Sequence, residues 1–478
     1  MPRLRARLAL VTCPFGQLAR GPAGTLLTFL IVLIGALAPA RARASNPWLT
    51  PLGGEAAMSG GAVATMGRDT GSAYYNPAGL GANTRAQFDM STTMAVLRFR
   101  TIPDAFRVDL PGGRSQSAQL SNIQPLILAT STVYTRYVGR GVTVGAGHFA
   151  NNYDFYDYSG VLKDDQNPGG LNYRSRVQVD GWSTRHHFGP TVGWQITPRF
   201  RIGMSVFLTY EWRRDEGRIW LQTGPTPELV SQNFIVGDID LKRSTYAGEA
   251  VFGLQWEFVK RWHTSLVIRT PRIVAYEKAR KYSLTTGAVV RDDKNSAALF
   301  DYDDDPGAAR RGRIAPMQVV LGLGYAFPRG RGWVSAEADY SPALRLPRNS
   351  VDLRHNVNAR VGARIRVSET VMMGLGLFTD RTNETAINDF PQFHIDYYGG
   401  SLGAELRRPF KLGKTERAKD IVFTTSVAFR YAFGVGSSGA VRFDLTEADN
   451  RRLSYSIGEV HPVQFHVWSG HLGAGLYF

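Results

Sequence analysis

Cysteine is almost absent from this sequence of 478 residues, in which Cys13 is the single example. A disulfide scaffold and a cysteine-based zinc site are excluded, because each needs several cysteines. The Gly-x-y repeat of collagen is also missing, although the 51 glycines exceed the usual share of about 7%. The hydrophobic fraction of 43% is too high for a disordered chain and too low for a helical membrane transporter. These absences leave a folded chain that does not depend on disulfides.

The first 44 residues have the layout of a secretory signal peptide. Several arginines precede an apolar run over residues 25–38, and Ala42 and Ala44 form a small-x-small cleavage site. This run of 14 residues is short for a membrane-spanning helix, which needs about 20. Cys13 precedes the run, whereas the lipidated cysteine of a lipoprotein ends it. We therefore predict a signal peptide over 1–44, with an uncleaved anchor as the alternative.

Period-2 alternation of apolar and polar residues is common beyond residue 44, whereas helical spacing is nearly missing. The last segment is the clearest case: Trp468, Leu472, Leu476 and Phe478 fall on one face, and small or polar residues on the other. We predict that these four residues form the C-terminal assembly signal of a membrane barrel. The same alternation covers residues 88–99, 126–137, 142–149, 200–212, 246–258, 319–327, 333–340 and 422–433.

Short and long connections alternate along the chain. The short ones are rich in turn formers and lie at 138–141, 197–200, 259–261, 328–332, 368–370 and, somewhat longer, 407–419. The long ones are polar and lie near 100–124, 154–181, 214–245, 276–313, 342–352, 379–393 and 434–465. Six short and seven long connections join fourteen strands and leave both ends on the short-turn side.

This layout predicts an all-β fold, a transmembrane antiparallel β-barrel of the outer membrane with about 14 strands over residues 87–478. A secreted sandwich or propeller is the alternative. Every backbone amide in hydrocarbon must be paired, so a barrel requires the strand near Phe88 to join the strand near Trp468.

A motif directly before the first predicted strand follows a stretch rich in Gly, Ala and Ser. It consists of Tyr74, Tyr75, Asn76, Pro77, Ala78, Gly79 and Leu80. Residues 53–80 resemble the N-terminal region of the outer-membrane long-chain fatty acid and hydrocarbon transporters, the FadL-like proteins. The resemblance implies a fourteen-stranded barrel with an N-terminal luminal plug, here 45–86, and passive uptake of hydrophobic molecules that leave sideways through the wall. The residues alone also allow a flexible periplasmic leader.

Two apparent ligand motifs do not fit their chemistry. The stretch 434–439 matches G-x-G-x-x-G, but no helix follows to hold a pyrophosphate, so we expect a glycine loop. The acidic stretch 301–305 is similar to a calcium loop, but its glycine comes one place late and the final Glu is missing, so we expect a solvated outer loop.

The sequence offers no convincing catalytic set. His186 and His187 are neighbours on a predicted strand, which sends them to opposite faces and makes them a poor metal pair. No nucleophile elbow is present, although a triad assembled in space stays open. We therefore expect no enzyme, no catalytic residue, no cofactor and no resident metal.

Basic residues, 56 against 40 acidic ones, gather in the predicted short turns. Examples are Arg140, Arg199, Arg201, Lys260, Arg261, Arg329 and Arg331. Either this rim lies against phospholipid headgroups or the turns are merely solvated. We expect outer-membrane lipid, lipopolysaccharide and, during insertion, the barrel-assembly machinery as partners, and no nucleic acid.

Three functions compete. The first is passive uptake of hydrophobic compounds, long-chain fatty acids or hydrocarbons, through a plugged barrel. The second is a non-transporting barrel that serves as an anchor or subunit of a surface or secretion assembly, and the third is an outer-membrane lipid enzyme. The charged stretches 214–245 and 276–313 depart from the apolar capture surface that the resemblance implies. Met90, Met94 and Phe99 lie near the motif in sequence, but no ligand site follows from them.

Overall fold

The structure is almost entirely β-sheet. A computed structural model describes residues 49–110, 114–164, 172–224, 233–292, 295–305, 316–346, 351–383, 393–412, 419–444 and 454–478. The predicted signal peptide, with Ala42 and Ala44, lies outside these residues. No helix in the described ranges is long and apolar enough to cross a membrane.

Within the described ranges, three short helices precede the strands, and a fourth occupies a turn. They are α2 (Gly54–Met58), α3 (Ser72–Tyr75), η3 (Pro77–Ala82) and η4 (Pro328–Gly330). The first nine strands are β1 (Gln87–Leu110), β2 (Arg114–Gly139), β3 (Val142–Asp164), β4 (Asn172–Thr197), β5 (Phe200–Gly224), β6 (Asn233–Val259), β7 (Trp262–Arg269), β8 (Ile273–Asp292) and β9 (Asn295–Asp305). The others are β10 (Gln318–Ala326), β11 (Gly332–Ser341), β12 (Leu344–Leu346), β13 (Val351–Leu353), β14 (Asn356–Arg366), β15 (Val371–Asp380), β16 (Phe393–Leu412), β17 (Lys419–Asp444) and β18 (Ser454–Tyr477).

Fourteen of these strands close into one ring. In order, they are β1 to β7, β10, β11 and β14 to β18, and each is hydrogen-bonded to the next. The ring closes between β1 and β18, where Phe88 lies opposite Leu476 and Leu97 opposite Trp468. Strand β8 pairs alongside residues 233–248 of β6, and β9 pairs alongside β8, so that both extend the wall toward the far end; β12 pairs with β13 apart from the ring. The predicted fourteen-stranded barrel is confirmed, with the closure that amide pairing requires.

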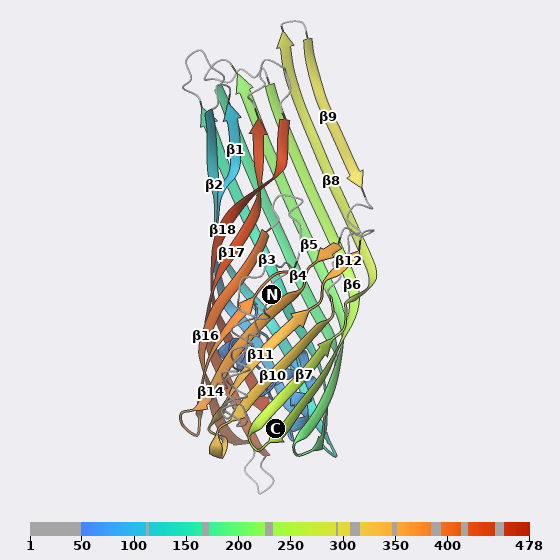
Figure 1. Ribbon diagram of the computed structural model, residues 1–478, viewed down its shortest axis with the longest axis vertical. Coiled ribbons are helices and arrows are strands. Elements are labelled where there is room, and N and C mark those ends of the chain that lie inside the picture. Colours follow the sequence, from blue (N-terminus) through green and yellow to red (C-terminus); the bar gives the residue numbers. More distant parts are fainter. Residues whose placement is uncertain are drawn as a thin grey trace, which may run out of the picture. The chain divides into compact units, whose positions relative to one another are not determined.

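All six predicted short connections join neighbouring strands of the ring. They lie between β2 and β3, β4 and β5, β6 and β7, β10 and β11, β14 and β15, and β16 and β17. Arg140, Arg261 and Arg329 have positive φ values of 53°, 71° and 56° in three of these turns. We call this the short-turn end of the barrel and the opposite end the far end; the short-turn end is at the bottom of Figure 1.

The predicted long connections are largely wrong as loops, because most of their residues continue the strands. The glycines of 434–439 lie inside β17, and the aspartates of 301–305 lie in β9. Backbone pairing persists in these stretches, and buried side chains such as Leu120 and Val177 lie on their inner face, so the polar residues among them do not end a strand. The wall is uneven: β1 to β6 have 23–27 residues, whereas β10, β11, β14 and β15 have 9–11. Figure 1 shows the long strands rising toward the far end.

The outer face of the wall is apolar. Along β15, Met373, Leu375 and Leu377 are 44–66% exposed, whereas Gly374 and Gly376 between them face the interior. Such alternation places an apolar surface outside and small or polar residues inside, which suits a barrel surrounded by lipid. On β18, Trp468, Leu472, Leu476 and Phe478 share this outer face, and their role as an assembly signal stays a prediction.

Candidate functional site: the barrel interior

Residues 49–86, which we call the N-terminal segment, are enclosed by the ring of strands. Hydrogen bonds of 2.7–3.2 Å join them to β1, β3, β5, β7, β11 and β16 through Gly53–Ser91, Asn83–Thr143, Ala73–Ser205, Thr65–Ser265, Thr65–Glu337 and Met58–Ser401. A segment that contacts strands all round a closed ring lies inside it. In Figure 1 the segment, in blue, lies among the strands in the half of the barrel nearer the short turns.

The predicted motif is buried and organised by Asn76. The Asn76 side chain accepts a hydrogen bond from the Ala78 amide (3.1 Å) and so caps η3, while Pro77 occupies the first helical position. Its Nδ2 donates to the carbonyl oxygens of Ala64 (2.7 Å) and Leu254 (3.2 Å), the latter on β6. This one amide therefore ties two turns of the segment to each other and to the wall.

A row of three wall glycines receives the motif. Gly193, Gly203 and Gly253 lie directly opposite one another on β4, β5 and β6. A Cβ atom at Gly203 would overlap the backbone of Pro77, and one at Gly253 would overlap the Asn76 side chain. The missing side chains let backbone approach backbone, so the fit leaves no room even for a methyl group.

Tyr74 connects the motif to a buried ionic group on the wall. Its hydroxyl accepts a hydrogen bond from Asn151 (2.6 Å), and the Arg269 guanidinium lies 4.2 Å from its ring centre. Arg269 also donates to the Tyr74 carbonyl oxygen (2.8 Å) and to Glu249 (2.5 Å). His187, on the inner face of β4, lies 3.0 Å from the same carboxylate. Charge and aromatic contact thus fix this turn of the segment.

A second ionic group holds the beginning of the segment. Arg364 of β14 is 1% exposed and bonds both Glu55 of the segment and Glu405 of β16, the latter at 2.8 Å. Asp69 accepts a hydrogen bond from the Glu55 amide (3.1 Å). Burial, and then the nearby charges of Glu55 and Asp89, raise the pKa of Asp69 well above its usual 3.8. One buried guanidinium therefore neutralises a group rich in carboxylates.

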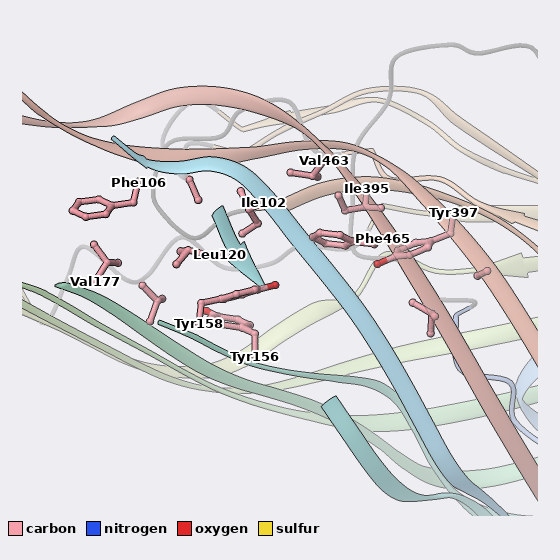
Figure 2. Packing of buried hydrophobic residues seen from close by; sticks show 14 of the residues in the cluster. Ile102, Phe106, Leu120, Tyr156, Tyr158, Val177, Ile395, Tyr397, Val463 and Phe465 are labelled. Carbon is pink, nitrogen blue, oxygen red and sulfur yellow. The ribbon is translucent and has the colours of Figure 1, made fainter. Parts of the chain in front are cut away.

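Farther from the short turns, the interior becomes apolar. Buried side chains from β1 to β4 and from β15 to β18 form one cluster, which we call the apolar cluster. Ile102, Phe106, Leu120, Tyr158 and Val177 in it have no exposed surface. Figure 2 shows these side chains together with those of β16 and β18. The barrel thus has two interior regions of different chemistry along its length.

Two buried arginines lie at the edge of the apolar cluster. The Arg100 guanidinium is 5.5 Å from the ring centre of Phe465, and that of Arg430 is 4.1 Å from the ring centre of Phe378. Both cations are placed over aromatic faces, where the ring quadrupole attracts positive charge. The change from polar to apolar interior therefore runs through cation–aromatic contacts.

Strand β1 changes its partner near the far end. It pairs with β18 as far as Thr101, but residues 106–109 pair in parallel with residues 441–444 of β17. The pairing of β16 with β17 extends to Ser438, and the pairing of β1 with β17 begins at Val441. The exchange occurs at a register shift that contains Asp104, whose φ is 48°. The first and last hairpins are thereby joined beside the apolar cluster.

Sequence reasoning found one part of this site and missed another. The structure brings Tyr74 to Leu80 against the wall, and it places the aromatic face of β18 on the outer surface of the barrel. Met90 and Phe99 are 46% and 37% exposed and face outward, so they do not line the interior. The buried arginines of β14 carried a usable signal, because Arg360 and Arg364 share one face of an alternating strand.

The two neighbouring histidines of β4 lie on opposite faces, as expected. His186 stacks outside against His148, with 2.9 Å between ring nitrogens, while His187 is buried inside. Within the described ranges, no group of three or more His, Cys, Asp and Glu side chains is placed to hold a metal ion.

The fold is shared with solved hydrocarbon channels. The Ralstonia pickettii toluene transporter TbuX matches with a TM-score of 0.50 and 14% identity, over 91% of this chain and 99% of that one. A deltaS2 mutant of the monoaromatic hydrocarbon channel TodX matches with a TM-score of 0.52 and 13% identity, over 90% and 99%. A Pseudomonas aeruginosa FadL homologue covers 92% of this chain and 98% of its own, with 13% identity and a TM-score of 0.48. No protein-family model and no curated protein matches the chain. The chain therefore shares the barrel fold of TbuX and TodX.

Proposed function

We propose that the chain is an outer-membrane channel for the passive uptake of hydrophobic compounds, with the N-terminal segment as its plug. The observation that carries this proposal is the apolar cluster inside a closed barrel, beyond a segment held by buried ion pairs. A solute that exchanges water for this interior gains about 25 cal/mol for each Å² of apolar surface buried. Toluene and long-chain fatty acids are the solute classes that the similar channels and the motif suggest.

In this proposal the two interior regions act in sequence. The apolar cluster receives the solute by exchanging side-chain contacts for solute contacts, which requires no energy source. The N-terminal segment blocks the remaining length of the barrel. Displacement of the turn around Tyr74 and Asn76 then opens a path, with lateral exit through the wall as the resemblance implies.

The alternative is a barrel that anchors or joins a surface assembly without transport. Such a barrel needs the apolar outer face, but it has no use for an apolar interior. We therefore favour uptake. The predicted insertion partner, the barrel-assembly machinery, and the predicted signal on β18 belong to both proposals.

The test compares hydrophobic-solute uptake by cells that make the full chain, a chain without residues 45–86, or no barrel. Labelled toluene and a labelled long-chain fatty acid are the probes. We expect faster uptake with the full chain than without it, and an altered rate with the shortened chain. Equal uptake by cells that make the full chain and by cells that make no barrel would overturn the transport proposal.

The shortened barrel must first be shown to fold, by its heat-sensitive migration in gels. If it folds and takes up solute at the rate of the full chain, the plug mechanism is wrong. Recovery of a stoichiometric protein partner from detergent-solubilised membrane, without any uptake, supports the anchor instead.

A further inference from the structure

A row of outward-facing tyrosines lies near the far boundary of the apolar outer surface, two residues from Trp212 on β5. Tyr246 of β6 lies directly between Tyr210 of β5 and Tyr276 of β8, with ring centres 4.9 and 6.1 Å apart. Trp256, exposed on the same strand and face, lies ten residues nearer the short turns. Ten residues of a tilted strand span about 25 Å, the height of the apolar band on outer-membrane barrels.

Basic residues stand immediately beyond this boundary on the same outer face. Arg214, Lys242 and Arg280 lie opposite one another on β5, β6 and β8, and Lys278 lies between Arg280 and the tyrosine row. We call these four residues the cationic row. Each of the three strands places its cation four residues beyond its tyrosine, about 10 Å along the barrel axis. This is the depth of lipid headgroups.

Carboxylates accompany the cationic row without burying it. Lys242 contacts Asp240 at 2.6 Å, and Arg214 contacts Glu216. The side chains of Arg214, Glu216, Asp240 and Lys242 are 30–52% exposed. Exposed ion pairs contribute only about 0–1 kcal/mol, so an anionic ligand can replace them. Carboxylates beside the cations can also take up divalent ions that accompany a phosphate.

We propose that the outer wall of β5, β6 and β8 binds a lipid A-type glycolipid of the outer leaflet through its phosphates. The acyl chains lie along the apolar wall below the tyrosine row, and the cationic row contacts the phosphates. The position at the far end selects the outer leaflet, because the short turns of such barrels face the periplasm. The inference rests on the membrane embedding in the proposed function, but not on transport.

The test measures lipid binding to the purified full-length barrel in detergent by native mass spectrometry. The probes are lipid A with two phosphates and the same glycolipid with both phosphates removed. We expect the triple variant Lys242→Gln, Lys278→Gln and Arg280→Gln to bind phosphorylated lipid A about tenfold more weakly. We expect the dephosphorylated lipid to bind the unaltered barrel as weakly as phosphorylated lipid A binds the triple variant.

A matched variant carries Arg136→Gln, Lys260→Gln and Arg366→Gln, three exposed basic residues at the short-turn end. It should bind lipid A like the unaltered barrel. Equal weakening by both triple variants, unchanged binding by the first, or equal binding of the dephosphorylated lipid would each overturn the proposal. Heat-sensitive migration verifies folding, and the single variant Arg280→Gln replaces the triple one if that fails. Solute uptake is measured in parallel, so failure of lipid binding and failure of transport are distinguished.

Discussion

The two interior regions hold their contents by different physics. Near the short turns, buried ion pairs, a glycine row and an Asn side chain fix a peptide segment in one position. Beyond the segment, the apolar cluster is held by non-directional contacts that another hydrophobic molecule can also make. Directional contacts suit a fixed occupant and non-directional ones suit a changing occupant. Under the proposed function, the region near the short turns is specific for the N-terminal segment, and the apolar cluster accepts solutes of different shapes.

Removal of Arg364 should destabilise the docked N-terminal segment more than any other change. The variant Arg364→Leu leaves the Glu55 and Glu405 carboxylates buried without this guanidinium, which costs about 3–5 kcal/mol. Hydrogen exchange of residues 53–69 should accelerate accordingly. Arg407 bonds the same Glu405 but is 37% exposed, so Arg407→Leu should have a much smaller effect. Equal effects would contradict the importance of burial.

A side chain added to the row of wall glycines should also destabilise the docked N-terminal segment, but by less. In Gly203→Ala the new methyl group meets the Pro77 and Ala78 backbone, and overpacking of this kind costs about 1–3 kcal/mol. Hydrogen exchange of residues 74–82 measures it. Gly470 of β18 has open space where a Cβ would lie, so Gly470→Ala is the matched control. If both variants leave exchange unchanged, the close fit is not what holds the motif.

A polar side chain in the apolar cluster should sharpen the contrast between the regions. Leu120→Asn keeps the size but buries an amide, and we expect solute uptake to fall about tenfold, equivalent to about 1.4 kcal/mol. Ile123 lies on the same strand and is 68% exposed, so Ile123→Asn should retain uptake. Equal uptake by the two variants would show that solutes avoid the cluster.

The smallest effect should be a dependence of segment docking on pH through Asp69. Its raised pKa means that the docked segment keeps a proton that the free segment releases above about pH 4. The contribution of Asp69 to docking is therefore fully present in acid and is lost as pH rises toward the raised pKa, by at most about 1.4 kcal/mol per pH unit. Protease accessibility of the segment follows this change. Asp69→Asn should flatten the profile, and an unchanged profile would assign it to other groups.

Local patterns were enough to predict the barrel but not its interior. Closure of β1 on β18 and the six turns follow from alternation and turn formers, which are properties of neighbouring residues. The partners of Arg364 are not local, because Glu55 is 309 positions away and its place depends on how the segment folds. The polar stretch 214–245 could not be recognised as strand, because charged residues stand on both of its faces and interrupt the alternation of apolar and polar residues.

The partner exchange of β1 also has a consequence for the order of assembly. The parallel ladder joins residues 106–109 to residues 441–444, and Arg442 bonds Asp109 across 333 positions of sequence. Contacts of such separation require the entropy cost of closing a long loop of chain to be overcome first. The free edge of β1 therefore stays unpaired until the last two strands, β17 and β18, are in place. We expect the pairing of β1 with β17 at the far end to be the slowest step in the assembly of this barrel.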